Sequence, residues 1–310
     1  MTFAIAFPGQ GSQSVGMLAD MAAEFPTIKA TFAEASDVLG YDLFDLVMNG
    51  PAEELNKTWQ TQPALLTSSV ALWRVWQELG GQQPQVMAGH SLGEYSALVC
   101  AGALAFRDAV KLVELRGRAM QEAVPEGVGA MSAIIGLDND TITANCAQAA
   151  EGQVVSPVNF NSPGQVVIAG HKEAVERANA LMKASGAKRA LPLPVSVPSH
   201  CALMQPAAEK LAVALEEVTI CVPVIPVINN VDVAAESDPV RIKEALVRQL
   251  FSPVRWTETV VAMADAGVVL EVEMGPGKVL SGLAKRIDSR VEGVAANDPA
   301  SVRDTLAKLA

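Results

Sequence analysis

A G-x-S-x-G pattern occupies residues 89–93, with Ser91 at its centre, between the apolar run Val86–Ala88 and a stretch compatible with a helix over Leu92–Val99. In this context a serine can lie on a sharp strand-to-helix turn, with its hydroxyl exposed and the neighbouring backbone N–H groups free. The alternative is a glycine-rich turn that happens to contain a serine. Because an apolar run comes before the pattern and a helical stretch after it, we predict that Ser91 is a catalytic nucleophile.

A serine hydroxyl is a weak nucleophile at neutral pH, so a base must take its proton. The chain contains 3 histidines. His90 adjoins the serine, and neighbouring side chains of an extended segment point apart. His171 opens a polar helical stretch and is expected to be solvated. His200 follows the strand-like run Leu191–Val197 and precedes a helix expected near Ala202, where α/β proteins often place catalytic loops. We therefore predict His200 as the base; the alternative is that it only caps the following helix.

A serine–histidine pair usually has a third group that holds the imidazole tautomer. No carboxylate is singled out by the sequence for this position, since the nearest acid after His200 is Glu209, on the polar face of its own expected helix. An amide or a backbone carbonyl could accept the Nδ1 proton instead. Such a group would orient the ring but stabilise the imidazolium less than a carboxylate would.

A helix expected over residues 107–123 places Arg116 on the same stripe as Leu112 and Met120, whereas Arg118 lies on the polar face. An unpaired guanidinium on an apolar face would be costly, so Arg116 should have an anionic partner. That partner could be an internal Asp or Glu, or it could be the carboxylate of a substrate, held by two parallel hydrogen bonds.

Two glycine-containing loops follow predicted strands. Residues 3–7 are nearly continuous apolar, as expected for a strand buried on both faces of a parallel sheet, and a loop at 8–13 follows. The next glycine is Gly16, so the dinucleotide spacing fails, but free N–H groups in this loop remain suited to an oxyanion. Residues 275–278 lack the rest of a phosphate loop, and we interpret them as a turn between a strand at 268–274 and a helix.

The middle of the chain differs in pattern from its ends. From Val128 to Val195 the expected order is βαββαβ, which is ferredoxin-like. This unit interrupts a larger region in which strands and helices alternate. We predict an α/β protein with an α/β-hydrolase-like large domain, built on a mostly parallel sheet from residues 1–126 and 197–310, and an inserted ferredoxin-like small domain at 127–196.

The predicted site residues lie on both sides of this insert. Ser91 and Arg116 precede it, and His200 follows it. We therefore expect the active site in the cleft between the two domains, with the small domain as a lid.

Several short segments, taken in order, carry a resemblance to a known family. They occupy residues 8–13, 62–64, 89–95, 161–165, 197–200 and 275–277, together with Arg116. Over essentially its whole length the chain resembles the malonyl-CoA:acyl carrier protein transacylases of bacterial fatty acid synthesis. The resemblance implies an acyltransferase that moves malonyl from malonyl-CoA to the phosphopantetheine thiol of acyl carrier protein through a malonyl-serine intermediate, without a cofactor or a metal.

The resemblance also assigns roles to residues. It implies that Ser91 is the acylated nucleophile, that His200 is its base and that Arg116 pairs with the malonyl carboxylate. The backbone N–H groups of Gln10 and Leu92 would form the oxyanion hole. The third position of the catalytic group would be filled from Gln249, through its carbonyl.

Composition limits the partners and the compartment. The formal net charge of −11 argues against nucleic acid and anionic membranes as partners. The four cysteines show no C-x-x-C spacing, as in reduced cytosolic proteins. The first basic residue is Lys29, so no signal peptide is expected, and the longest apolar run, residues 97–106, is too short to span a bilayer. We expect a cytoplasmic enzyme whose partners are acyl carrier protein and coenzyme A thioesters.

In the family that the chain resembles, the carrier protein is strongly acidic, so a net-negative enzyme would need a local basic patch to bind it. The candidates are Lys285, Arg286 and Arg290, along with Lys188 and Arg189.

Two other functions compete with acyl transfer. A serine hydrolase such as an esterase or thioesterase would share Ser91 and His200 but would not need Arg116 on an apolar stripe. A non-catalytic subunit that binds carrier protein would usually lack Ser91 or His200, and both are present.

Overall fold

The computed structural model describes residues 1–195 and 197–310. Its strands are β1 (Phe3–Phe7), β2 (Val86–Gly89), β3 (Gly129–Ile135), β4 (Val155–Ser162), β5 (Gln165–His171), β6 (Arg189–Pro192), β7 (Val227–Ile228), β8 (Leu270–Glu273) and β9 (Glu292–Ala295). Its helices are α1 (Ala19–Glu24), α2 (Pro26–Leu39), α3 (Leu43–Asn49), α4 (Ala52–Leu55), α5 (Thr58–Glu78), α6 (Gly93–Cys100), α7 (Phe106–Ala123), α8 (Asn139–Ala150), α9 (Lys172–Ala184), the 3-10 turn η1 (Ala202–Met204), α10 (Gln205–Glu216), α11 (Pro239–Gln249), α12 (Trp256–Asp265), α13 (Val279–Ile287) and α14 (Pro299–Leu309).

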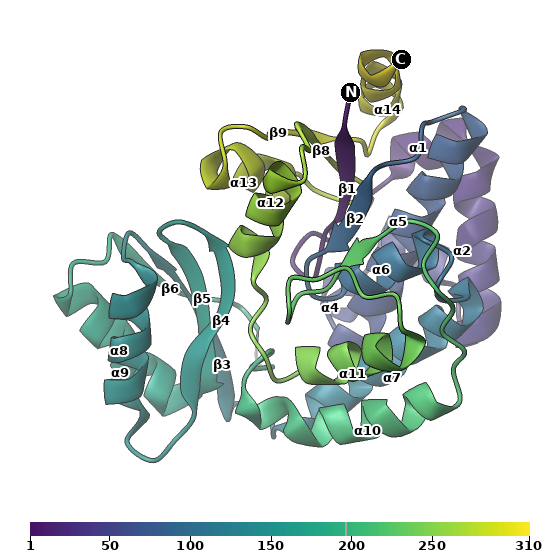
Figure 1. Ribbon diagram of the computed structural model, residues 1–310. Coiled ribbons are helices and arrows are strands. Elements are labelled where there is room, and N and C mark those ends of the chain that lie inside the picture. Colours follow the sequence, from purple (N-terminus) through teal and green to yellow (C-terminus); the bar gives the residue numbers. More distant parts are fainter. Residues whose placement is uncertain (196) are drawn as a thin grey trace.

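The larger sheet has the strand order β7-β2-β1-β8-β9, and all of its pairs are parallel. Helices cover both faces, with α5, α6 and α7 on one side and α12 and α13 on the other (Figure 1). Every residue of β1 is buried. Alternate residues of this strand enter two different cores, because Ile5 belongs to the first cluster and Ala6 to the second. This arrangement confirms the predicted parallel strand that is buried on both faces.

The smaller sheet is antiparallel, with the order β4-β5-β3-β6. Helices α8 and α9 pack on the face turned away from the larger sheet (Figure 1) and share a separate core that includes Ile134, Ile168 and Met182. The βαββαβ order and the mostly parallel larger sheet confirm the predicted fold class. The domain boundaries at 126 and 197 stay a prediction, and the smaller sheet lies inside them.

One predicted strand is shorter than expected. The run Leu191–Val197 was expected to be extended up to the segment that contains His200, but β6 ends at Pro192. Prolines have no N–H to donate to a ladder, and Pro194 follows two residues later. His200 therefore lies in an irregular segment, beyond Ser196, which is outside the described residues.

The larger sheet brings two loops together. In the parallel pair of β1 and β2, Phe7 lies opposite Gly89, so the chain leaves both strands at the same edge. Ligands of open parallel sheets bind at this carboxyl edge. The loop that follows β1 and the turn that holds Ser91 are neighbours for this reason. None of the described helices is both long and apolar enough to cross a membrane.

Candidate active site

The turn after β2 has the close packing that a nucleophile elbow requires. Ser91 has a left-handed backbone, with φ of 52°. A Cβ added at Gly89 would lie 1.8 Å from the carbonyl carbon of Gly93, and one added at Gly93 would lie 2.1 Å from the Phe7 oxygen. The two glycines therefore supply space between strand and helix, while the serine itself adopts the strained conformation.

A side-chain amide anchors this turn. The backbone N–H of Ser91 donates to Oδ1 of Asn230 at 2.8 Å, and Nδ2 of Asn230 donates to the Gly89 carbonyl at 2.7 Å. These two hydrogen bonds with Asn230, which is distant in the sequence, stabilise the strained backbone at Ser91.

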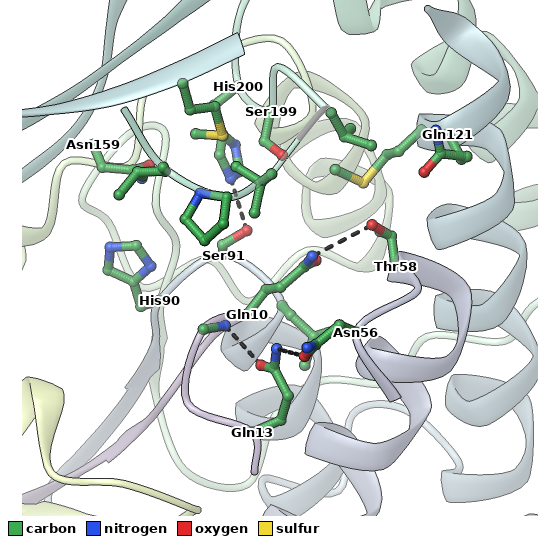
Figure 2. Close-up of a pocket in the computed structure, with 18 of the residues that line it drawn as sticks. Gln10, Gln13, Asn56, Thr58, His90, Ser91, Gln121, Asn159, Ser199 and His200 are labelled. Carbon is green, nitrogen blue, oxygen red and sulfur yellow. Dashed lines mark hydrogen bonds between the residues drawn. The ribbon is translucent and has the colours of Figure 1, made fainter. Parts of the chain in front are cut away.

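Ser91 and His200 form a hydrogen-bonded pair. Ser91 Oγ lies 2.7 Å from Nε2 of His200 (Figure 2), and the histidine is only 3% exposed. Nδ1 of His200 lies 2.7 Å from the main-chain carbonyl oxygen of Gln249. Because a carbonyl only accepts hydrogen bonds, the ring proton belongs on Nδ1, and Nε2 is left to accept the serine proton. Burial, reinforced by the charge of Arg116, lowers the pKa of His200 to about 3, so the ring is neutral at physiological pH.

The other two histidines have different partners. Nε2 of His90 lies 2.8 Å from Oδ1 of Asn161, and burial lowers the pKa of this histidine. His171 was expected to be solvated, but its Nδ1 accepts the Val154 N–H at 2.9 Å and it is only partly exposed, because β4 pairs beside it. Neither side chain hydrogen-bonds to Ser91 Oγ among the described residues, so the structure favours the pairing with His200.

Arg116 is buried at the inner end of the site, with 1% of its surface exposed. Its Nη1 donates to Oε1 of Gln62 at 2.9 Å, and its Nη2 donates to Oε1 of Gln249 at 3.0 Å. Nη2 also lies 3.5 Å from Ser91 Oγ, and the guanidinium lies 5.4 Å from the ring centroid of Tyr95.

No Asp or Glu among the described residues forms an ion pair with Arg116, and its Nε has no hydrogen-bond partner there. The sequence left two partners open for Arg116, an internal acid or the carboxylate of a substrate. The described residues contain no acid paired directly with it. A buried guanidinium whose protein partners are neutral amides and a hydroxyl is suited to receive a carboxylate from outside.

A carboxylate does lie one amide away. Nε2 of Gln249 donates to Oε2 of Glu94 at 2.8 Å and to the Ser91 carbonyl at 3.1 Å. Burial raises the pKa of Glu94 to about 7. Sequence reasoning missed both Glu94 and Asn230, since an acid in the first turn of a helix usually faces solvent and Asn230 lies in an unpatterned segment. The only available signal was that Glu94 directly follows the G-x-S-x-G pattern.

Ser91, His200 and Arg116 line a cavity of about 600 Å³ (Figure 2). Its wall includes Gln10 and Leu92, whose backbone N–H groups donate no hydrogen bond within the described chain. The smaller sheet contributes Met131 and Asn159 to the same cavity. The cleft between the two sheets therefore holds a nucleophile, a neutral base, free backbone donors and a buried cation, which together suit acyl transfer.

Of the basic residues predicted to bind acyl carrier protein, Arg290 is already paired with acids of this chain. Arg290 forms ion pairs with Asp265 at 2.9 Å and with Asp288 at 2.6 Å, so its charge is already offset. Arg286 is exposed and donates to Oε1 of Gln165 at 3.0 Å. Gln165 and Arg189 lie in register on the two sides of Ile135. The two groups of basic residues therefore approach the same end of the smaller sheet.

Comparison with known proteins agrees with this chemistry. The acyl transferase domain family matches residues 5–303. The chain is 68% identical over 304 residues to the malonyl CoA-acyl carrier protein transacylase of Salmonella typhimurium, with 98% of each chain covered. It is 47% identical over 300 residues to the enzyme of the same name from Bacillus subtilis, with 96% of this chain and 94% of the other covered.

Solved structures agree with the sequence relatives. An acyl carrier protein S-malonyltransferase from Vibrio cholerae superimposes with a TM-score of 0.97 at 68% identity, covering 98% of this chain and all of that one. A malonyl-transacylase solved in complex with a type II PKS acyl-carrier protein gives a TM-score of 0.99 at 65% identity, covering 99% of this chain and all of that one.

Proposed function

Because the chain belongs to the malonyl CoA-acyl carrier protein transacylases, an acyl transferase family, we propose that it moves malonyl from malonyl-CoA to acyl carrier protein through an ester on Ser91. The product supplies the extender unit for fatty acid synthesis. The observation that carries the proposal is the Ser91–His200 pair, 2.7 Å apart, beside a buried arginine that has no carboxylate partner among the described residues.

The first step forms the acyl-enzyme. Nε2 of His200 accepts the proton of Ser91 as Oγ attacks the thioester carbonyl carbon. The resulting oxyanion accepts hydrogen bonds from the free N–H groups of Gln10 and Leu92, which stabilise charge where it develops. The carbon–sulfur bond then breaks, and the imidazolium of His200 returns the proton to the departing coenzyme A thiolate.

The second step reverses the roles. The phosphopantetheine thiol of acyl carrier protein gives its proton to His200 and attacks the malonyl ester. The oxyanion again lies against Gln10 and Leu92, and the ester carbon–oxygen bond breaks. His200 then protonates Ser91 Oγ, which restores the starting enzyme. Each step exchanges one acyl bond for another, so the proposed reaction needs no cofactor or metal.

Arg116 provides the selectivity in this mechanism. Its Nη2 lies 3.5 Å from the nucleophilic oxygen, close enough to pair with a carboxylate on the same acyl group. A buried cation without a paired acid favours an acyl group that carries a negative charge over one that is neutral.

A thioesterase is the second candidate, because Ser91 and His200 would also serve hydrolysis. A carbonyl that holds the His200 ring stabilises the imidazolium less than a carboxylate would, which gives limited help to an attacking water. The test is incubation with malonyl-CoA, with and without acyl carrier protein. Malonyl-carrier formation that far exceeds free malonate supports transfer, and free malonate at the same rate in both reactions supports hydrolysis.

We also place the protein in the cytoplasm. All four cysteines are unpaired, and three of them are buried, as is usual for proteins in reducing compartments. Fractionation of cells that express the tagged protein would test this location.

A further inference from the structure

Glu94 is a buried carboxylate beside the active site that the proposed steps do not use. It lies in the first turn of α6, three residues after Ser91, and is 2% exposed. Its Oε2 accepts two hydrogen bonds, from the backbone N–H of Asn230 at 2.9 Å and from Nε2 of Gln249 at 2.8 Å. A buried carboxylate is costly to desolvate, so a chain that keeps one there needs these partners.

The side-chain amide of Gln249 has only one workable orientation. Its Nε2 donates to Glu94 and to the Ser91 carbonyl, and its Oε1 accepts from Arg116. If the amide were rotated by half a turn, its NH2 would face a guanidinium, which only donates. Its oxygen would face a carboxylate and a carbonyl, which only accept. Glu94 and Arg116 therefore fix the amide from its two ends.

This amide also separates two opposite charges. In a direct ion pair, the Glu94 carboxylate would occupy hydrogen-bonding positions of Arg116. With Gln249 between them, Glu94 bonds to the amide and the guanidinium keeps donors for a ligand. The hydrogen-bond acceptors of Arg116 in the described chain are accordingly neutral: the amide oxygens of Gln62 and Gln249 and the hydroxyl oxygen of Ser91.

We propose that Glu94 is a positioning residue for malonyl selectivity, because it holds the Gln249 amide that holds Arg116 beside the nucleophile. The inference rests on the proposed function, since it concerns how the same site recognises the carboxylate of its acyl group. Glu94 does not touch the acyl group itself.

The structure offers variants that separate the hydrogen bond from the rest of the side chain. In Glu94→Gln, the amide oxygen can replace Oε2 and accept both bonds, while its nitrogen replaces Oε1, which accepts no hydrogen bond from the described residues. Glu94→Ala removes the acceptor altogether. Glu273→Gln is a matched control, since Glu273 is also a buried carboxylate but accepts hydrogen bonds from Ser281 in α13, away from the cavity.

The measurement is the ratio of kcat/KM for malonyl-CoA to that for acetyl-CoA, which does not depend on the fraction of folded enzyme. Loss of a hydrogen bond that involves a charged group predicts a fall in this ratio of about tenfold or more for Glu94→Ala. We expect Glu94→Gln to recover most of the ratio and Glu273→Gln to leave it unchanged. An equal loss toward both substrates in Glu94→Ala would mean a purely structural role and would overturn the proposal.

A second background tests whether Glu94 acts through Gln249. Gln249→Leu removes the amide but keeps the main-chain carbonyl that accepts from His200. On this background, Glu94→Ala should lower the ratio no further, whereas an unchanged additional loss would contradict the proposed route. Wild-type malonyl transfer, measured in the same series, tests the proposed function separately. If the wild type transfers malonyl and the ratio does not respond to Glu94→Ala, only the inference about Glu94 fails.

Discussion

Nη2 of Arg116 lies 3.5 Å from the Ser91 hydroxyl oxygen, so the cation that recognises the acyl group and the atom that receives it share one end of the cavity. Arg116 therefore contacts the same acyl group that Ser91 attacks. The selectivity of the enzyme should therefore appear in the acylation step as well as in substrate binding.

Replacement of Arg116 by Ala should separate charged from neutral acyl groups. A malonyl carboxylate left unpaired in the cavity costs roughly 2–5 kcal/mol. Malonyl transfer should therefore fall by at least about tenfold. Acetyl transfer should hold or improve, because the desolvated guanidinium no longer penalises a neutral group. The specificity constants for malonyl-CoA and acetyl-CoA give the measurement.

The matched control is Arg118→Ala on the same helix, since Arg118 is exposed and pairs with Glu114. It should leave both constants near those of the wild type. If malonyl and acetyl activities fall together in Arg116→Ala, then Arg116 is a structural residue and the account of selectivity is wrong.

Packing at the elbow gives a prediction about stability. Gly93→Ala would place a Cβ 2.1 Å from the Phe7 carbonyl oxygen, so β1 and α6 would have to separate. We expect severe destabilisation or failure to fold. Gly282→Ala is the control, because no atom outside the backbone of its own helix lies within 4 Å of its added Cβ, and alanine in α13 should stabilise by up to about 1 kcal/mol. Thermal unfolding of both variants and the wild type gives the measurement. A melting temperature for Gly93→Ala equal to that of the wild type would refute the close packing.

The burial of neutral His200 predicts a pH dependence of stability. Its pKa is lowered to about 3 in the folded protein, against 6.5 for an ordinary histidine. The unfolded chain therefore binds a proton that the folded chain does not, and the contribution of His200 to stability is lost as the pH falls below 6.5. The change is at most about 1.4 kcal/mol per pH unit.

Glu94 affects the free energy of unfolding in the opposite direction. Its pKa is raised to about 7, so its contribution to stability is lost as the pH rises toward that value. Both proteins contain it, so it cancels when wild type is compared with His200→Gln. We expect denaturant unfolding from pH 5 to pH 7 to show that the free energy of unfolding of the wild type, relative to that of the variant, falls as the pH is lowered. Parallel curves would mean that the pKa of His200 is the same in the folded and the unfolded chain.

The predicted docking patch can be tested on its remaining cations. Because Arg290 is paired internally, we assign the carrier-protein interaction to Lys285 and Arg286 together with Lys188 and Arg189. Reversal of Lys285 and Arg286 to Glu should raise the KM for acyl carrier protein several-fold and leave that for malonyl-CoA unchanged. Reversal of the exposed Lys183 on α9, on the outer side of the smaller sheet, is the control. Equal effects on both substrates would remove this patch from the account.

The sequence predicted the elements that follow periodic patterns. The buried strand at Phe3–Phe7 was found as expected, and α7 begins one residue before the expected start, because continuous and striped apolar patterns determine burial directly. The expected strand over Leu191–Val197 was wrong in its length, because the run contains prolines and β6 ends at Pro192. Glu94 could not be found as part of the site, because its role depends on Gln249, 155 residues away in the chain.

Formation of the covalent intermediate tests the central claim most directly. Intact-mass spectrometry after brief exposure to malonyl-CoA should show one added malonyl group on the wild-type enzyme, located at Ser91 by peptide mapping. Ser91→Ala should stay unlabelled under the same conditions, and steady-state kinetics of the wild type with both substrates should be ping-pong. Labelling of Ser91→Ala, or intersecting double-reciprocal lines for the wild type, would contradict transfer through a malonyl-serine.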